Sequence, residues 1–154
     1  MRILVFSDSH GHTTRLRAAA KSVRADAIIH LGDHAKDAEI LRDIAPLYVV
    51  QGNCDFTDAP IEQVLELGGK RLFITHGHRY YVKSDLDALY HAADKAGAHV
   101  ALYGHTHLPG YEYRGRMLLL NPGAIIGSRD TRKSTFAVLE WRSGGEIYMQ
   151  MMEI

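Results

Sequence analysis

Residues 2–11 read Arg-Ile-Leu-Val-Phe-Ser-Asp-Ser-His-Gly and predict the first strand of an α/β protein. The apolar run is short for a helix, and its β-branched and aromatic side chains favour a strand. Asp8 and His10 follow that strand at its C-terminal end, where open α/β sheets place their functional groups. Because Asp8 and His10 are two residues apart in extended chain, we expect their side chains to point the same way. A carboxylate and an imidazole directed at one point suit a divalent metal ion. Alternatively, Asp8 starts a turn or caps the next helix, and His10 has no role.

Composition predicts one globular domain spanning residues 1–154, with 46% hydrophobic residues. Eighteen basic and eighteen acidic side chains give no formal net charge, so neither a nucleic-acid polymer nor a membrane is an expected partner. The N-terminal apolar stretch is too short for a signal peptide, and no run reaches membrane-spanning length. A single cysteine, Cys54, cannot form an internal disulfide. We therefore expect a cytoplasmic protein.

Apolar segments and helical patterns alternate in the first third of the chain. Strands are predicted at residues 27–31 and 47–51, and a helix at residues 36–44. A further helix starts after a cap at Thr13 or Thr14. Its apolar positions Leu16, Ala19, Ala20 and Val23 lie on one helical face. This alternation predicts parallel strands with right-handed crossovers.

The second half of the chain predicts a more antiparallel arrangement. Residues 62–67 and 71–75 flank two glycines as in a hairpin, and a helix capped by Ser84 follows. Further strands are predicted at residues 100–103 and 117–120, and residues 135–141 and 146–152 form a closing hairpin. Four tyrosines are assigned to loops, where they line a substrate mouth or a subunit contact: Tyr80, Tyr81, Tyr111 and Tyr113.

Oxygen and nitrogen ligands follow five of the predicted strands. They are Asp8, His10, Asp33, Asn53, His76, His105 and His107. Each one alone has an ordinary explanation as a turn or surface residue, but the repetition at five strand ends favours a common site. Seven ligands are too many for one zinc ion, and the absence of thiolates excludes a structural cysteine site. Two metal ions that share one carboxylate fit this set.

The same positions carry six short motifs along the chain. They are Asp8-Ser9-His10, Gly32-Asp33, Gly52-Asn53-Cys54-Asp55, His76-Gly77-His78, Gly104-His105-Thr106-His107 and Asn121-Pro122-Gly123. In this order they resemble the motifs of the calcineurin-like metallophosphoesterases. The size resembles the small single-domain bacterial and archaeal phosphodiesterases, which are related to a eukaryotic retromer subunit. The resemblance implies an α/β (α+β) fold, a four-layer sandwich of two facing mixed β-sheets flanked by helices.

The resemblance also implies how the ligands are shared between two divalent ions. Asp8, His10 and His107 would bind one ion, Asn53, His76 and His105 the other, and Asp33 would bridge them. Manganese is the expected metal, with iron, zinc or nickel as alternatives, because imidazole-rich coordination suits magnesium least. No other cofactor is expected.

The function expected from this resemblance is a metal-dependent phosphodiesterase. A metal-bridging hydroxide attacks phosphorus in line, and Asp33, Asn53 and His78 form the catalytic set. Many family members have histidine at the position of Cys54, so His78 is the expected substitute proton donor. The alternatives are a catalytically weak metal-binding scaffold of the retromer-subunit type and a nuclease of the same superfamily. The expected partner is a small phosphodiester, and a homo-oligomer is left open.

The remaining histidines divide into site and structural candidates. His12 and His78 each lie two residues beyond a ligand and are candidates for contacting phosphate. His30 is expected to be a hydrogen-bonded core residue, and His34 to flank the cleft. His91 and His99 are assigned to the surface or to packing.

Overall fold

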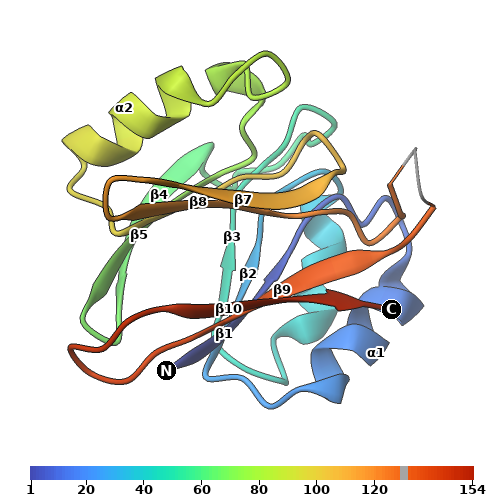
Figure 1. Ribbon diagram of the computed structural model, residues 1–154. Coiled ribbons are helices and arrows are strands. Elements are labelled where there is room, and N and C mark those ends of the chain that lie inside the picture. The colour runs from blue at the N-terminus through green and yellow to red at the C-terminus, as the bar shows by residue number, and fades with distance from the viewer. Residues whose placement is uncertain (129–131) are drawn as a thin grey trace.

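The computed structural model describes residues 1–128 and 132–154, whose strands form two five-stranded sheets (Figure 1). In the first sheet the order is β10 (Tyr148–Glu153), β9 (Thr135–Glu140), β1 (Arg2–Phe6), β2 (Ala27–His30) and β3 (Leu47–Val49). In the second it is β4 (Glu62–Leu67), β5 (Lys70–Thr75), β6 (Val100–Leu102), β8 (Met117–Pro122) and β7 (Pro109–Arg114). Both sheets contain parallel and antiparallel pairs, as predicted.

Strand β1 is apolar throughout because both of its faces are buried. Ile3 and Val5 pack between the two sheets, whereas Leu4 and Phe6 pack on the opposite face among helical residues. Full burial of each such side chain contributes about 1.5–3 kcal/mol. A strand buried on both faces reads as a continuous apolar run rather than an alternating one.

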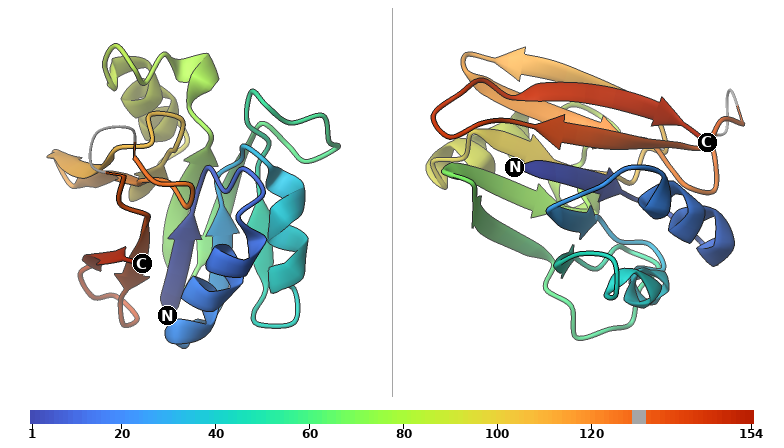
Figure 2. Two further views of the ribbon diagram at one scale, coloured as in Figure 1. Left: turned by 90° about the vertical axis from the view of Figure 1, so that its right-hand side faces the viewer. Right: turned by 90° about the horizontal axis from the view of Figure 1, so that it is seen from below.

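Helices cover the outer faces of the two sheets and complete four layers (Figure 2). The first sheet is covered by α1 (Thr13–Ser22) and the 3-10 helix η1 (Ala35–Leu41), and the second by α2 (Asp87–Lys95). A short 3-10 turn, η2 (His78–Tyr80), follows β5. The predicted four-layer sandwich is therefore confirmed. Within residues 1–128 and 132–154, no helix has both the length and the apolar character needed to cross a membrane.

The predicted helix caps are wrong. Helix α1 starts after His12 and α2 after Leu86, and neither of these residues makes a side-chain cap hydrogen bond. The segment predicted at residues 36–44 is the shorter η1, which ends at Leu41. Burial of Leu16 and Leu89 on the inner faces fixes these helices, so tertiary packing replaces the capping contribution.

Strand β7 was not predicted, and it contains two of the tyrosines assigned to loops. Tyr111 and Tyr113 pair opposite Leu120 and Leu118 of β8. Most of β7 is exposed at the edge of the sheet, so its sequence lacks the buried apolar positions that mark a strand. Pairing with the buried strand β8 decides its conformation.

Parallel pairing brings the C-terminal ends of six strands together. β1, β2 and β3 run parallel in the first sheet, and β5, β6 and β8 run parallel in the second. Most of the predicted ligands follow these strands directly. Because of this topology, residues that are far apart in sequence lie at one edge of the sandwich.

We predict that Leu102→Ala destabilises the protein strongly. Leu102 is fully buried between the sheets, so truncation leaves a cavity and should lower the free energy of unfolding by about 2–5 kcal/mol. Urea unfolding followed by circular dichroism measures the change. The control Tyr148→Ala, at a residue that is 71% exposed, should change stability by less than about 0.5 kcal/mol.

Candidate metal centre

Asp8 follows β1 and is a fully buried carboxylate that connects the two sheets. Its Oδ2 accepts hydrogen bonds from the Ser7 hydroxyl and from the backbone N–H of His105, at 3.2 Å. His105 follows β6 in the second sheet. Asp8 does not cap the next helix, because α1 starts after His12.

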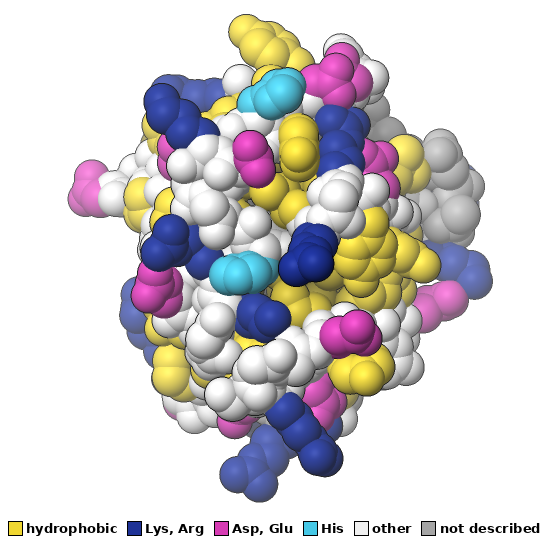
Figure 3. Space-filling model, turned by 60° about the vertical axis from the view of Figure 1, so that its left-hand side comes forward, with side chains coloured by type: hydrophobic (Ala, Val, Ile, Leu, Met, Phe, Trp, Pro, Cys, Tyr) yellow, Lys and Arg dark blue, Asp and Glu magenta, His cyan; other side chains and the backbone are white. Residues whose placement is uncertain are grey.

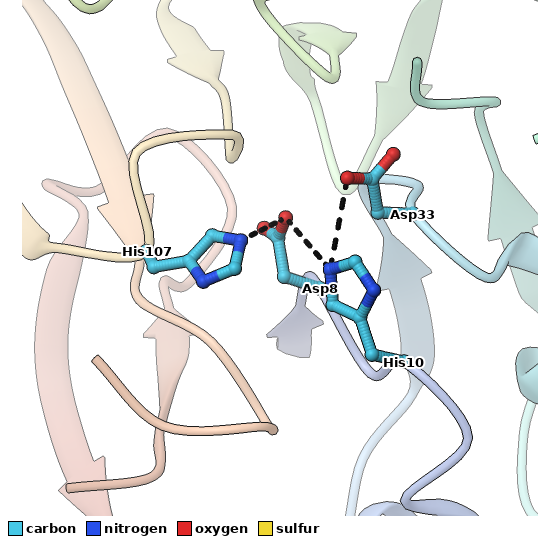
Figure 4. Close-up of side chains that lie close together, drawn as sticks. All are labelled: Asp8, His10, Asp33 and His107. Carbon is cyan, nitrogen blue, oxygen red and sulfur yellow. Dashed lines mark ion pairs between the residues drawn. The ribbon is translucent and has the colours of Figure 1, made fainter. Parts of the chain in front are cut away.

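Four side chains converge beside Asp8 (Figure 4). His107 Nε2 lies 3.0 Å from Asp8 Oδ1, on the side opposite His10. His10 Nε2 lies 3.9 Å from Asp8 Oδ1 and 3.7 Å from Asp33 Oδ2. These four residues can offer one ligand atom each to a single ion.

His76 faces the oxygen of Asp33 that is not directed at His10. His76 Nε2 lies 3.5 Å from Asp33 Oδ1 and 3.2 Å from Asn53 Oδ1. The ring of His105 lies 5.1 Å from that of His76. His76 Nδ1 donates to Leu31 O at 2.7 Å, so in the neutral ring Nε2 is unprotonated and faces the two oxygens.

All seven predicted ligand side chains are thus brought to one site, with Asp33 in the middle. Asp33 Oδ2 faces His10, and Asp33 Oδ1 faces His76 and accepts the backbone N–H of Cys54 at 2.9 Å. One carboxylate therefore presents an oxygen to each of two clusters of ligand atoms. This is the arrangement that a bridging ligand requires.

The backbone is left-handed at most of the ligand positions. Asp8, His10, Asp33, His105 and His107 have φ between 42° and 68°, so the expected extended geometry of Asp8 and His10 is wrong. Such conformations cost about 1–3 kcal/mol at non-glycine residues and cluster at functional sites. Tight turns after each strand aim the side chains inward. Gly104 permits one of these turns, because a Cβ there would lie 2.0 Å from Ser7 Oγ.

The site fits a divalent cation on its own geometry. Asp8 Oδ1 and His10 Nε2 are buried without a hydrogen-bond partner within residues 1–128 and 132–154, although the ring nitrogen of His107 lies close to Asp8. Buried polar atoms without hydrogen bonds are unfavourable unless an ion or a proton compensates them. Carboxylate and imidazole donors around one point suit manganese, iron or zinc.

Electrostatics keeps the carboxylates ionised. Burial opposes ionisation of Asp8 and Asp33, but interactions with the rings of His107 and His76 respectively lower both pKa values overall. Burial opposes protonation of His76, yet the facing carboxylates raise its pKa overall. Burial lowers the pKa of His105 to about 4, which leaves its ring neutral and able to bind metal at pH 7.

Several supporting residues had no role in the sequence-based prediction. Asp55 accepts the backbone N–H groups of Asp33, Ala35 and Gly52, at 2.8–2.9 Å, and so fixes the two turns that carry Asp33 and Asn53. Asn121 Nδ2 donates to Gly104 O at 2.8 Å. In the sequence, only the positions of Asp55 and Asn121 within the Gly-Asn-Cys-Asp and Asn-Pro-Gly motifs indicated that they have a role at the site.

His30 is a hydrogen-bonded core residue, as expected. Gly32 N donates to its Nδ1 at 3.3 Å, so Nε2 carries the hydrogen and faces Ser9 Oγ at 3.2 Å. Ser9 in turn donates to Asp37 at 2.8 Å. This chain of hydrogen bonds holds the turn between Asp8 and His10.

The other candidates lie around the rim. The ring of His78 lies 5.5 Å from His76, and its Nδ1 is buried without a hydrogen-bond partner among the described residues. The ring of His34 lies 5.0 Å from the ring of His10, at an angle of 52°, and flanks the site. Cys54 is exposed, and partial burial together with the charge of Asp33 raises the pKa of its thiol. His12 is exposed and directly precedes α1, and His99 accepts the backbone N–H of Arg71.

Comparison with known families agrees with this geometry. Residues 1–144 match the model of the calcineurin-like phosphoesterase superfamily domain. The chain belongs to this superfamily. It is 37% identical over 142 residues to the probable metallophosphoesterase YsnB of Bacillus subtilis strain 168, covering 90% of this chain and 83% of YsnB. It is 32% identical over 169 residues to the phosphodiesterase YfcE of Escherichia coli K12, covering 91% of this chain and 88% of YfcE.

Solved structures share the fold over nearly the whole chain. A conserved uncharacterized protein from Streptococcus pneumoniae TIGR4, titled a predicted phosphoesterase, superposes with a TM-score of 0.79 at 29% identity, covering 99% of this chain and 97% of that one. Zinc-complexed Vps29 of Entamoeba histolytica also gives 0.79, at 21% identity, covering 99% of both chains. The first match supports a phosphoesterase, whereas the second shows the fold alone.

We predict that His30 makes stability fall at mildly acidic pH. Burial lowers its pKa from 6.5 to about 4, so below pH 6.5 the unfolded chain binds a proton that the folded chain does not. The stability should fall as the pH drops from 6.5 to 4, on the order of 3 kcal/mol. Urea unfolding of the metal-free protein across this range measures the loss. His30→Gln should lose less than wild type, and the exposed control His91→Gln should behave like wild type. An equal loss in wild type and His30→Gln would contradict this assignment.

Proposed function

We propose that this protein is a dinuclear, manganese-dependent phosphodiesterase of small substrates in the cytoplasm. The observation that carries the proposal is the position of Asp33, whose two oxygens face His10 on one side and His76 on the other. Family membership supports phosphoester chemistry, and the relative YfcE is named a phosphodiesterase. Two divalent ions held here would activate a water molecule and neutralise the phosphoryl oxygens.

The side chains of the site have distinct roles in this proposal. Asp8, His10 and His107 would hold one ion, Asn53, His76 and His105 would hold the other, and Asp33 would serve both, as the distances between these side chains allow. His78 is the proton donor to the leaving group and acts in its protonated form, although burial lowers the pKa of the ring. Cys54 is a poorer donor because the pKa of its thiol is raised.

A complete ligand set favours an enzyme over a scaffold. Vps29 shares the fold, but at 21% identity that likeness carries no activity to this chain. A nuclease acting on long polymers is disfavoured by the balanced charge, since polymer binding depends on neutralising several phosphates. On the face drawn in Figure 3, basic and acidic side chains are interspersed rather than gathered into a basic track.

The first test removes the metal or its shared ligand. Chelation should abolish hydrolysis of bis(4-nitrophenyl) phosphate, and added manganese should restore it. Asp33→Asn should lower kcat by at least about 100-fold, because one substitution weakens both ion sites, and metal analysis should show fewer ions per chain. Asp43→Asn, which changes an exposed carboxylate paired with Arg17, is the matched control and should keep full activity. Full activity in the chelated protein would exclude the proposal.

The second test identifies the proton donor. A positioned acid contributes about 10²- to 10⁴-fold to expulsion of a poor leaving group and little to that of a good one. His78→Ala should therefore reduce hydrolysis of alkyl diesters far more than hydrolysis of aryl diesters. Cys54→Ser should keep most aryl-diesterase activity. Rates plotted against leaving-group pKa give the slope for each variant. A slope that steepens in Cys54→Ser and not in His78→Ala would assign the proton to the thiol instead.

A further inference from the structure

A hollow of about 220 Å³ opens directly beside the metal centre. One wall is formed by residues 54–57 of the loop after β3, and the other by His34, Lys36 and Asp37 at the start of η1. Neither wall contains a metal-ligand candidate. The hollow therefore lies outside the centre itself, and it has no role in the proposed reaction described so far.

Two contacts connect the hollow to the centre. The ring of His34 lies 5.0 Å from the ring of His10. On the other wall, the backbone N–H of Cys54 donates to Asp33 Oδ1 at 2.9 Å. The two walls therefore adjoin the turns that carry His10 and Asp33, so a phosphate held at the centre by metal ions could extend one substituent toward the hollow.

Phe56 presents an aromatic ring at this mouth. Its side chain is 94% exposed, more than any other large apolar side chain of the described residues. The neighbouring Asp55 is fixed by three backbone N–H donors, so the ring is carried on an anchored turn. An exposed aromatic ring on a fixed backbone is suited to stacking against a planar group.

The walls of the hollow carry one ammonium group, on Lys36, and two carboxylates, on Asp37 and Asp55. Asp37 accepts from Ser9 Oγ and Gly11 N, and Asp55 is likewise occupied by backbone donors, so both carboxylates are engaged. Lys36 makes no ion pair with any residue of 1–128 or 132–154. Its ammonium group is therefore available to a bound anion.

A second hollow of about 490 Å³ extends the first away from the centre. The two share Lys36 and Thr57, and the second continues to Arg42. Glu39 and Arg42 form an ion pair with each other on its wall. Together the hollows have room for more than a single ring, with Lys36 at their junction.

We propose that this hollow binds an aromatic arm of the substrate, such as a nucleobase with its sugar, by stacking on Phe56. Lys36 contacts a further anionic oxygen of that arm. This inference rests on the proposed function and narrows it to phosphodiesters that carry a heteroaromatic substituent. Phe56 and Lys36 are then specificity residues rather than metal ligands.

The test measures binding, so its result does not depend on turnover. Calorimetric titration of the manganese-supplied protein should give tighter binding of adenosine monophosphate than of inorganic phosphate, because only the nucleotide has a ring to stack. Phe56→Ala should weaken nucleotide binding by about fivefold or more and leave phosphate binding unchanged. Phe56→Trp should retain nucleotide binding. Tyr148→Ala, at an exposed aromatic residue of β10 outside the hollow, is the control and should match wild type.

Lys36 is tested with a ligand that carries an additional charge. Lys36→Met should weaken binding of adenosine diphosphate more than binding of adenosine monophosphate. Equal nucleotide affinity in wild type and Phe56→Ala, or nucleotide binding no tighter than phosphate binding, would overturn the inference. Failure of the proposed function looks different, since it would be an absence of diester hydrolysis whatever these affinities are.

Discussion

The interaction on which the rest of the site depends is the buried carboxylate of Asp8. It follows the central strand β1 and accepts a hydrogen bond from the backbone of His105, which follows strand β6 of the other sheet. This contact fixes the turn of one sheet against that of the other. The distances between Asp8, His107 and His10 then follow from tight turns that start at fixed strand ends.

Burying several carboxylates and imidazoles together is unfavourable unless their charges compensate one another. Here Asp33 is stabilised by the backbone of Cys54 and by His76, and Asp8 by Ser7 and His107. Among the ligand atoms, Asp8 Oδ1 and His10 Nε2 remain buried without hydrogen bonds in the part of the chain that the structure describes, and a bound cation would compensate this deficit. The same groups therefore explain both the cost of the folded site and why a cation would stabilise it.

Two groups of residues surround the metal centre: one group holds its turns in place, and the other faces the open hollow. Asp55 and Asn121 act on backbone groups of the turns and keep the ligand positions fixed. Phe56 and Lys36, by contrast, make no contact that the turns require, and they face an open hollow. This division separates the residues that make the chemistry feasible from those that could select among substrates.

Much of the fold and most of the converging site residues could be predicted from the sequence. The buried runs of β1 and β2, the hairpin of β4 and β5, and the repetition of Asp, Asn and His after strands predicted the sandwich and the residues that converge at its edge. These signals are local, because burial on both faces requires an apolar run and each turn requires its own residues.

Only the tertiary structure decided the geometry within that site. The left-handed backbone at Asp8 and His10, the position of Asp33 between two ligand clusters and the hydrogen bonds to Asp55 all depend on segments distant in sequence. The same holds for β7, which is a strand because β8 lies beside it, and for α1 and α2, which form without the predicted caps. In each case a contact across the fold outweighs a local preference of the chain, and a linear sequence does not state which segments will meet.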